Sequence, residues 1–278
     1  SGGSPTAVTA TGIIALVDSD GIEQLNFASG STLYIQVTDN DRNADDSSAE
    51  TITVTASSET ESSGETVTLT ETGAATGIFL GSISFEEAAA SSGDGVLQVA
   101  RGDKLTGAYT DPADDFGNEI TITDVAFYSV SLKSGLIYVN DTWASSDSPF
   151  LVTGDVTVNS GVTLTIEPGV EVRFTELSDD QSGGEDQNRS ELRVYGILIA
   201  NGTAADTIVF TSNAESPASG DWYGIYLRDN NAGGSFKYNR IEYATYGIRS
   251  QSLYGSISDT IYVTNSRVHT CGTGIYFD

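Results

Sequence analysis

The chain has 278 residues and a formal net charge of −27, because 39 acidic residues stand against 12 basic ones. Such a polyanion repels nucleic acid and anionic membrane surfaces, so we expect no nucleic-acid partner. The single cysteine excludes an intrachain disulfide and therefore the small disulfide scaffolds. No apolar run approaches the roughly 18 residues of a membrane helix, so we expect no direct membrane insertion.

The composition is typical of strands and turns. Hydrophobic residues make up 38% of the chain, and they are mostly Val, Ile, Leu, Tyr and Phe among many Thr, Ser and Gly. We therefore expect an all-β protein with a packed core. Methionine is absent, and from this we expect a processed or excised piece of a longer product. The acidity itself has three competing explanations: specific cation sites, a salt-rich habitat and plain solubility.

The first predicted domain spans residues 11–130, after a flexible tail over residues 1–10. Short runs alternate apolar and polar residues and are separated by Gly, Ser and Asp; they include "STLYIQV" (31–37), "TITVT" (51–55), "TVTLT" (66–70) and "TGIFLGSI" (76–83). In the last run Ile78 and Leu80 are expected on the buried face. This period of two predicts an antiparallel sandwich with one buried and one wet face per sheet.

The acidic run "DNDRNADD" (39–46) places oxygen-bearing side chains at every second residue. Calcium takes 6–8 oxygen ligands at about 2.3–2.6 Å, and alternate positions of a loop can supply them. With Asp39 as position 1, Ala44 stands where an EF-hand needs Gly, so this is not an EF-hand. The predicted calcium ligands are Asp39, Asp41, Asn43 and Asp45, completed by Glu71, Asp111, Asp114 or Asp115.

Two simpler interpretations remain open for these acids. The run 39–46 is also compatible with Asx-turns at a solvated hairpin end. The sequence "DSDG", with Asp18 and Asp20, is either a second cation site or a turn.

Three segments of this half resemble a module repeated in very large bacterial surface proteins: "VTDNDRNADDSSAETITVTASS", "ETVTLTETGAATGIFLGSI" and "GDGVLQVARGDKLTGAYTDPADD". The similarity covers roughly residues 30–115. It implies an immunoglobulin-like sandwich that acts as a spacer or stalk, with no catalytic role.

The pattern changes after a connector at residues 131–147. In residues 148–278 short strands are joined by Gly, Asn and Pro, and the pair Gly-Ile recurs at 224, 247 and 274. With an offset of 27, "RIEYATYGI" (240–248) lies on "RVHTCGTGI" (267–275), which pairs Arg240 with Arg267. Repeats of this length built from strands indicate a solenoid. The acidic insertion 176–192 is expected to protrude as a loop.

The stretches "NDTWASSDSPFLVTGDVTVNSGVTLTIEPGVEVRF", "LRVYGILIANGTAADTIVFTS" and "DWYGIYL" resemble right-handed parallel β-helix proteins. The resemblance covers roughly residues 136–278 and implies that fold, incomplete at its C-terminal end. Some such proteins are polysaccharide lyases or hydrolases, and many are surface or adhesin-like proteins without known activity.

Little in the sequence indicates catalysis. His269 and Cys271 share a strand face about 6–7 Å apart, too far for direct activation. The basic residues of the later repeats, with Arg240 above Arg267, are either a polysaccharide-binding stripe or a surface ladder. Trp143 and Trp222 are either sugar-stacking platforms or covers over a rung or over the open end of the solenoid.

These observations predict an extracellular cell-surface protein with a structural or adhesive role, such as a stalk, surface layer or filament segment, stabilised by calcium. Its expected partners are other copies or other cell-surface components. The alternative is a carbohydrate-active enzyme or polysaccharide-binding module that uses the β-helix surface.

Overall fold

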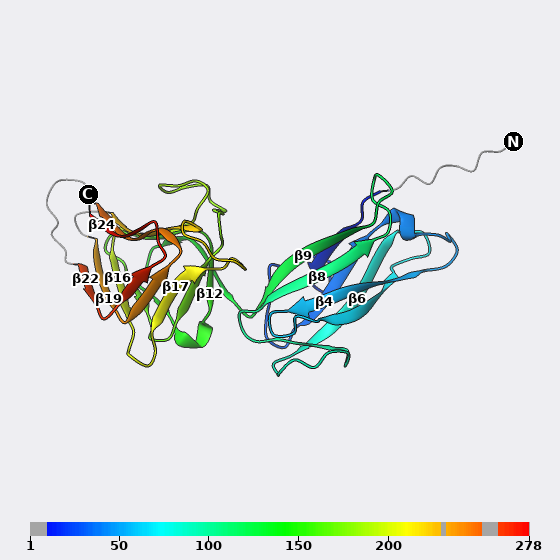
Figure 1. The fold of residues 1–278 in the computed structure, drawn as a ribbon, viewed down its shortest axis with the longest axis horizontal. Coiled ribbons are helices and arrows are strands. Elements are labelled where there is room, and N and C mark those ends of the chain that lie inside the picture. The colour runs from blue at the N-terminus through cyan, green and yellow to red at the C-terminus, as the bar shows by residue number, and fades with distance from the viewer. Residues whose placement is uncertain (1–9, 229–231, 252–260, 278) are drawn as a thin grey trace. The chain divides into compact units, whose positions relative to one another are not determined.

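The computed structural model describes residues 10–228, 232–251 and 261–277, so the predicted tail lies outside them except for Ala10. The chain divides into two compact units, Ser1–Val130 and Ser131–Asp278, which are described separately (Figure 1). In the described residues strands dominate, and the helical elements are two single 3-10 turns. No helix in this part of the chain is long and apolar enough to cross a membrane.

Nine strands of the first unit form one hydrogen-bonded sheet in the described residues, with the path β1-β3-β6-β5-β4-β8-β9-β2 and β7 beside β6. The elements are β1 (Ile13–Val17), β2 (Asn26–Phe27), β3 (Thr32–Thr38), η1 (Asn40–Arg42), β4 (Thr51–Ser58), β5 (Glu65–Glu71), β6 (Ile78–Glu86), β7 (Val96–Gln98), β8 (Lys104–Asp111) and β9 (Ile120–Tyr128). Period-two alternation explains the inner face, since Leu33, Ile35 and Val37 of β3 are all buried.

The face of β6 differs from the prediction. Phe79 and Ile83 enter the core, whereas Ile78 and Leu80 lie on the half-buried face. The reason is the register with β3, which pairs Phe79 with the buried Val37. Because Ile78, Phe79 and Leu80 are all apolar, alternation alone does not say which of them face the core. The pairing with β3 decides this.

The first sheet is mixed rather than purely antiparallel. Most pairs are antiparallel, but β2 pairs with β9 and β7 with β6 in parallel. The sheet is curled, and the Leu16 amide of β1 donates to Asp124 of β9 at 2.7 Å. A two-sheet immunoglobulin-like arrangement therefore remains a prediction.

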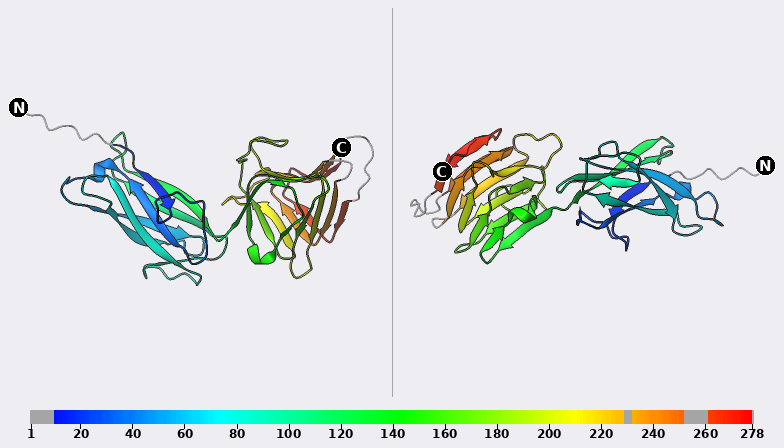
Figure 2. Two further views of the ribbon diagram at one scale, coloured as in Figure 1. Left: turned by 180° about the vertical axis from the view of Figure 1, so that it is seen from behind. Right: turned by 90° about the horizontal axis from the view of Figure 1, so that it is seen from below.

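The second unit is built from short strands that coil (Figure 2). Its elements are β10 (Ser131–Ile137), β11 (Asp141–Trp143), η2 (Ser145–Asp147), β12 (Phe150–Val158), β13 (Thr163–Ile166), β14 (Glu171–Phe174), β15 (Glu191–Val194), β16 (Ile197–Asn201), β17 (Ile208–Ser212), β18 (Trp222–Arg228), β19 (Gly233–Lys237), β20 (Asn239–Glu242), β21 (Ala244–Gln251), β22 (Ile261–Thr264), β23 (Arg267–His269) and β24 (Thr273–Phe277). Residues 131–147, expected as a connector, contain β10 and β11, which pair with β12 and β13.

Three parallel stacks form the walls of this coil in the described residues. The first stack is β14-β17-β20-β23, and the second is β15-β18-β21-β24. The long β12 joins the two stacks, because its first half pairs with β14 and its second half with β15. The third stack is β11-β13-β16-β19-β22. The chain thus adds one strand to each wall per turn. The predicted offset of 27 is confirmed, since Arg240 pairs with Arg267 and Glu242 with His269.

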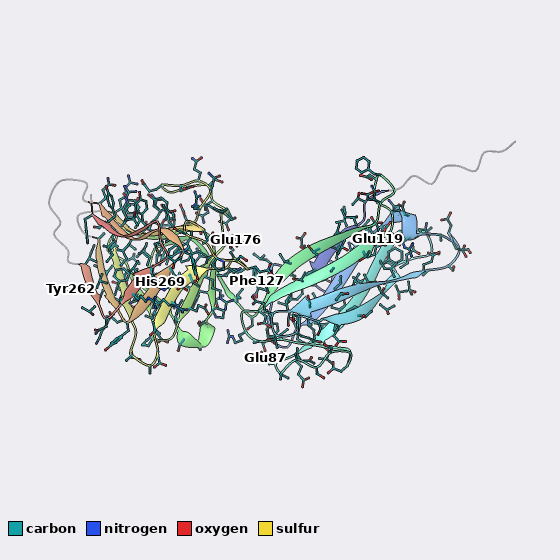
Figure 3. The ribbon with its side chains drawn as sticks, viewed as in Figure 1. Glu87, Glu119, Phe127, Glu176, Tyr262 and His269 are labelled. Carbon is teal, nitrogen blue, oxygen red and sulfur yellow. The ribbon has the colours of Figure 1, made fainter. Side chains whose placement is uncertain are left out.

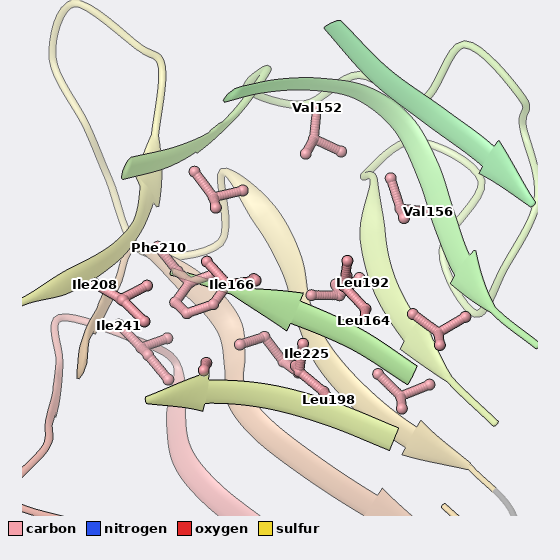
Figure 4. Close-up of a cluster of buried hydrophobic side chains, with 14 of the residues drawn as sticks. Val152, Val156, Leu164, Ile166, Leu192, Leu198, Ile208, Phe210, Ile225 and Ile241 are labelled. Atoms are coloured by element: carbon pink, nitrogen blue, oxygen red, sulfur yellow. The ribbon is translucent and has the colours of Figure 1, made fainter. Parts of the chain in front are cut away.

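Apolar side chains from all three stacks fill the interior (Figure 4). Along the second stack Val156, Leu192, Ile225 and Ile248 occupy equivalent inward positions and are buried. Burial of such a side chain contributes about 1.5–3 kcal/mol, so each turn of the coil stabilises its neighbours.

Both tryptophans belong to this core. Trp143 stacks on Phe150 with ring centroids 5.0 Å apart, and Trp222 stacks on Phe174 at 3.9 Å. Each is 0% exposed. The sugar-stacking interpretation of Trp143 and Trp222 is therefore wrong, because both rings lie inside the core.

Glycine at position 196 permits the close approach of successive turns. A Cβ there would lie 2.1 Å from the Val162 carbonyl oxygen and 2.5 Å from that of Asn159. We predict that Gly196→Ala destabilises the second unit by about 3 kcal/mol, because backbone must move to admit the methyl group. Both tryptophans lie in this unit, so urea unfolding followed by tryptophan fluorescence measures it alone.

The matched control is Gly161→Ala, where a Cβ meets nothing within 4 Å and the penalty comes from a φ of +77°. We expect a loss of about 1–2 kcal/mol there. Equal losses in the two variants would contradict the close-approach argument.

Candidate functional site

Four of the predicted calcium ligands lie around the backbone that leads into β1, without forming one cluster. Asp39 follows β3, Asp41 lies in η1, Asp111 ends β8, and Asp115 lies in the next loop. Asp39 and Asp111 are almost fully buried, at 2% and 0% exposure. Their Oδ2 atoms lie 3.4 and 3.5 Å from the position that a Cβ on Gly12 would occupy. The strand ends thus bring acids from distant segments together.

These carboxylates bind the backbone of residues 10–12. Asp41 Oδ2 accepts from the Ala10 amide at 3.0 Å, Asp115 Oδ1 from the Thr11 amide at 3.0 Å, and Asp111 Oδ2 from the Gly12 amide at 2.7 Å. Three consecutive N–H groups therefore partly compensate the clustered negative charge. This anchoring role of the acids was not predicted from the sequence.

Burial dominates the electrostatics of Asp39. Desolvation raises the pKa of its carboxyl group, and the neighbouring Asp111 and Asp41 charges raise it further. Hydrogen bonds from the Tyr109 hydroxyl, at 2.6 Å, and from the Asp41 amide act in the opposite direction. The pKa of Tyr109 is itself raised, first by burial and then by Asp39. The site therefore favours neutralisation by a proton or a cation.

The remaining predicted ligands lie in separate local structures. Glu71 Oε1 accepts from the Thr76 and Gly77 amides, both at 2.7 Å. Asp45 accepts from Ser47 and Ser48, which lower its carboxyl pKa, with the Ser47 hydroxyl bond the largest cause. The eight predicted residues thus do not form one coordination shell.

Two further members of the predicted set also have local partners. The Asn43 side-chain amide donates to Asp46 at 3.0 Å. Asp114 accepts from the Asn118 and Phe116 amides within its own turn, and the Asn118 bond is the largest cause of its lowered pKa. Asp18 likewise accepts from the Asp20 and Ile22 amides, so the turn interpretation of "DSDG" is confirmed.

The fit to calcium can be judged from the donors present. Within residues 10–228, 232–251 and 261–277, no three Asp, Glu, His or Cys side chains converge as around a metal ion. Calcium also accepts carbonyl and water oxygens, so two carboxylates can suffice as protein charges. Asp39 and Asp111 provide hard oxygen donors of the correct type, and each carboxylate oxygen retains a second lone pair. Calcium at this position stays a prediction.

A second set of functional side chains points outward from the second stack of the other unit. Strand register aligns Arg193, Tyr226, Arg249 and Tyr276 in one column. The Arg249 guanidinium lies 4.7 Å from the Tyr226 ring centroid and 6.0 Å from that of Tyr276. Cation–π contacts thus link successive turns. We call this column, with the neighbouring Tyr223 and Tyr246, the tyrosine–arginine face.

Two buried acids lie at the base of this face. Asp155 of β12 is 3% exposed and Glu191 of β15 is 0% exposed, and the Glu191 amide donates to Asp155 Oδ1 at 3.1 Å. Burial, then the Asp179 charge, raises the pKa of Asp155 to about 6. Burial, then the Asp155 charge, raises the pKa of Glu191 to about 8. Arg193 partly offsets these effects, with its Nε atom 3.1 Å from Glu191 Oε1.

The acidic insertion 176–192 covers these acids instead of only protruding. A Cβ on Gly184 would lie 2.5 Å from Asp155 Oδ2 and 2.4 Å from Glu191 Oε1. Glu185 of the same loop forms ion pairs with Arg228 and, at 3.8 Å, with Arg249. Glu176, labelled in Figure 3, is one of the exposed residues of this segment. The described arrangement therefore closes the Asp155–Glu191 pair to a large substrate.

The sequence offered one overlooked signal for this pair. Asp155 lies in the strand "FLVTGDVTV", and Glu191 begins the strand "ELRV". Charges on adjacent turns become neighbours once the strands stack, but the 36-residue interval between Val156 and its partner Leu192 hid the register.

His269 is paired with an acid from the preceding turn. Its Nε2 atom lies 3.0 Å from Glu242 Oε2, and Glu242 also accepts from the Thr211 hydroxyl at 3.0 Å. His269 lies on β23 (Figure 3). Cys271 packs partly buried against the core, and burial raises its thiol pKa. The geometry thus gives Cys271 no activated nucleophile character.

Comparisons with known proteins agree with the stacked parallel strands. A family described as a pectate-lyase-like beta helix domain matches residues 135–231. The second unit is a parallel β-helix. A stretch of 123 residues, 44% of this chain, is 29% identical to Protein bark beetle of Drosophila melanogaster. The matched stretch spans only 4% of the length of that protein.

The raised acid pKa values predict a pH dependence of the β-helix. Burial and the Asp155 charge raise the pKa of native Glu191 to about 8, whereas a glutamate of the unfolded chain has a pKa near 4.5. Stability contributed by this group is therefore present at low pH and decreases as pH rises toward 8. We predict that Glu191→Gln removes a slope of up to about 1.4 kcal/mol per pH unit from urea unfolding between pH 5 and 8.5.

The control is Glu176→Gln, an exposed acid of the same segment. It should keep the wild-type pH profile when both variants are followed by tryptophan fluorescence. An unchanged profile in Glu191→Gln would show that Glu191 is ionised in the native protein at neutral pH.

Proposed function

We propose that this chain is a segment of an extracellular cell-surface protein with a structural or adhesive role, stabilised by calcium. Other copies or other cell-surface components would be its partners. The observation that carries this proposal is the burial of Asp39 and Asp111, whose Oδ2 atoms lie 3.4 and 3.5 Å from the position of a Cβ on Gly12. Buried like charges need a counterion or protons, and a cation supplied from outside would stabilise the folded state by mass action.

The fold supports a structural role for both units. A β-helix buries a continuous core along its axis, and each turn contacts only its neighbours. Further turns therefore lengthen it with the same packing. We propose that its coil is right-handed and that the curled first sheet corresponds to an immunoglobulin-like sandwich. Both refinements rest on the sequence resemblances at residues 136–278 and 30–115.

Calcium should raise the melting temperature of the first unit. At a free concentration of 100 times Kd the expected gain is about 2.7 kcal/mol, or roughly 10–20 °C for a domain of about 100 residues. Far-UV circular dichroism records the melting of both units, and tryptophan fluorescence identifies the transition of the β-helix, so the other transition is that of the first unit. We predict that the double variant Asp39→Asn, Asp111→Asn shows a reduced calcium-dependent shift.

The control is Glu23→Gln, which removes one exposed charge of the same unit and should keep the full shift. If the double variant shows the same calcium-dependent shift in melting temperature as the wild type, Asp39 and Asp111 are not calcium ligands. A wild-type protein that melts identically in calcium and in chelator would refute calcium stabilisation.

A second candidate function is polysaccharide binding by the tyrosine–arginine face. Tyr246 packs between Tyr223, at 5.5 Å between ring centroids, and Tyr276, at 5.7 Å. Tyr276 is 41% exposed, so its ring can stack on a sugar while Arg249 offers hydrogen bonds. The similarity of residues 135–231 to a pectate-lyase-like domain favours this candidate as well.

We expect Tyr276→Ala to weaken binding of pectate about tenfold if this face binds polysaccharide, because one stacking contact is worth about 1.4 kcal/mol. Affinity electrophoresis with pectate, and with a neutral glucan for comparison, measures the effect. Tyr262→Ala is the control, since Tyr262 is an exposed tyrosine on β22 of the third stack, 61% exposed (Figure 3). Retardation by neither glycan would reject polysaccharide binding.

A further inference from the structure

Glu185 attaches the acidic insertion to the tyrosine–arginine face. Its backbone amide donates to Glu191 Oε1 at 3.0 Å. Its carboxylate accepts from Arg228 through Oε1, and its Oε2 atom lies 3.8 Å from Arg249 Nη1. The two arginines belong to the paired strands β18 and β21. One residue of the insertion therefore contacts the wall of the β-helix through its backbone and two arginines through its side chain.

The two guanidinium groups lie against aromatic rings. Arg228 Cζ is 5.8 Å and Arg249 Cζ is 4.7 Å from the centroid of the Tyr226 ring. The Arg249 side chain also donates to the Tyr223 hydroxyl. These contacts hold the guanidinium donors in fixed positions. A carboxylate between two arginines, with the 41% exposed Tyr276 ring close by, is the chemistry that recognises an acidic sugar.

The acids beneath the insertion oppose its closed position. Asp155 Oδ2 and Glu191 Oε1 lie 2.5 and 2.4 Å from the place of a Cβ on Gly184. Asp155 Oδ2 and Glu191 Oε2 are buried and accept no hydrogen bond from any residue that the structure describes. Buried acceptors in this state cost free energy, which water relieves when the insertion moves away. The insertion therefore stays closed only while other contacts, such as those of Glu185, compensate this cost.

We propose that Glu185 is an intramolecular competitor for the ligand of the tyrosine–arginine face. Its carboxylate occupies the position between Arg228 and Arg249 that the carboxylate of a uronic acid residue takes when an acidic polysaccharide binds. Binding displaces Glu185 and releases the insertion from the face. This inference rests on the polysaccharide-binding candidate above and adds the regulation of that site, because the closed insertion lowers its affinity.

Arg189 makes the opening of the insertion measurable. It is the one basic residue between positions 176 and 192, so trypsin cleaves the insertion only after it. In the closed position its Nε atom donates to the Gly220 carbonyl oxygen at 2.6 Å, and the following Ser190 is 0% exposed. The rate of cleavage between Arg189 and Ser190 therefore reports how often the insertion opens.

The test compares Glu185→Gln with Glu176→Gln in the whole chain. Both variants remove one negative charge from the same insertion, so the long-range repulsion of an anionic ligand changes equally, and Glu176 is an exposed acid. The ligand is trigalacturonate, with maltotriose as the neutral trisaccharide. Calorimetry in chelator measures affinity without bridging calcium, and mass spectrometry quantifies the tryptic cleavage after Arg189. Circular dichroism confirms that each variant is folded.

We expect Glu185→Gln to bind trigalacturonate about fivefold more tightly than wild type and Glu176→Gln do, because the competing ion pair is partly exposed and of modest strength. Trypsin should cleave Glu185→Gln about fivefold faster than wild type when no ligand is present. Trigalacturonate should accelerate the cleavage of wild type, and maltotriose should not.

The outcomes separate this inference from the candidate function on which it rests. If wild type and Glu185→Gln bind trigalacturonate equally well, Glu185 is no competitor, while polysaccharide binding stands. If neither binds, polysaccharide binding is rejected and the inference with it. Equal cleavage of wild type and Glu185→Gln would show that Glu185 does not hold the insertion closed, and this too would overturn the inference.

Discussion

Strand register is the constraint on which both units depend, because it decides which side chains face the core and which charges meet. In the β-helix the pairing of β15, β18, β21 and β24 puts Leu192, Ile225 and Ile248 inside. The same pairing places Arg193, Tyr226 and Arg249 next to one another on the outer face. One set of backbone hydrogen bonds therefore builds the core and the outer face together, and no outward residue can shift without moving an inward one.

Because the chain is strongly acidic, the strand register also brings carboxylates close to one another. Their charges are compensated in different ways. Asp41, Asp111 and Asp115 accept backbone N–H groups of residues 10–12. Glu191 lies beside the Arg193 guanidinium, and burial raises the pKa of its carboxyl group. Acids at strand ends meet acids from other strands, and a divalent cation is the counterion that their oxygen donors suit. This view connects an acidic composition to folding without invoking catalysis.

Alternation and repeat spacing predicted strands in both units and the coil of the second, but they missed β10 and β11 in the expected connector. The pairing of Arg240 with Arg267 followed from a repeat of 27 residues, which needs no side-chain detail. The face of β6 was wrong because Ile78, Phe79 and Leu80 are all apolar, so the pattern could not choose. The burial of Asp155 and Glu191 was missed because it depends on a loop, 176–190, whose path no local pattern specifies. The curled, mixed first sheet depends on long-range pairing of β2 with β9.

The central claim is that calcium neutralises acids at the strand ends of the first unit. The most direct measurement is a crystal structure of the chain grown in calcium, with anomalous difference density collected at long wavelength. The account predicts a peak between Asp39 and Asp111, surrounded by oxygen atoms. Density maps without a peak at this position, from crystals that hold calcium in the solvent, would contradict it.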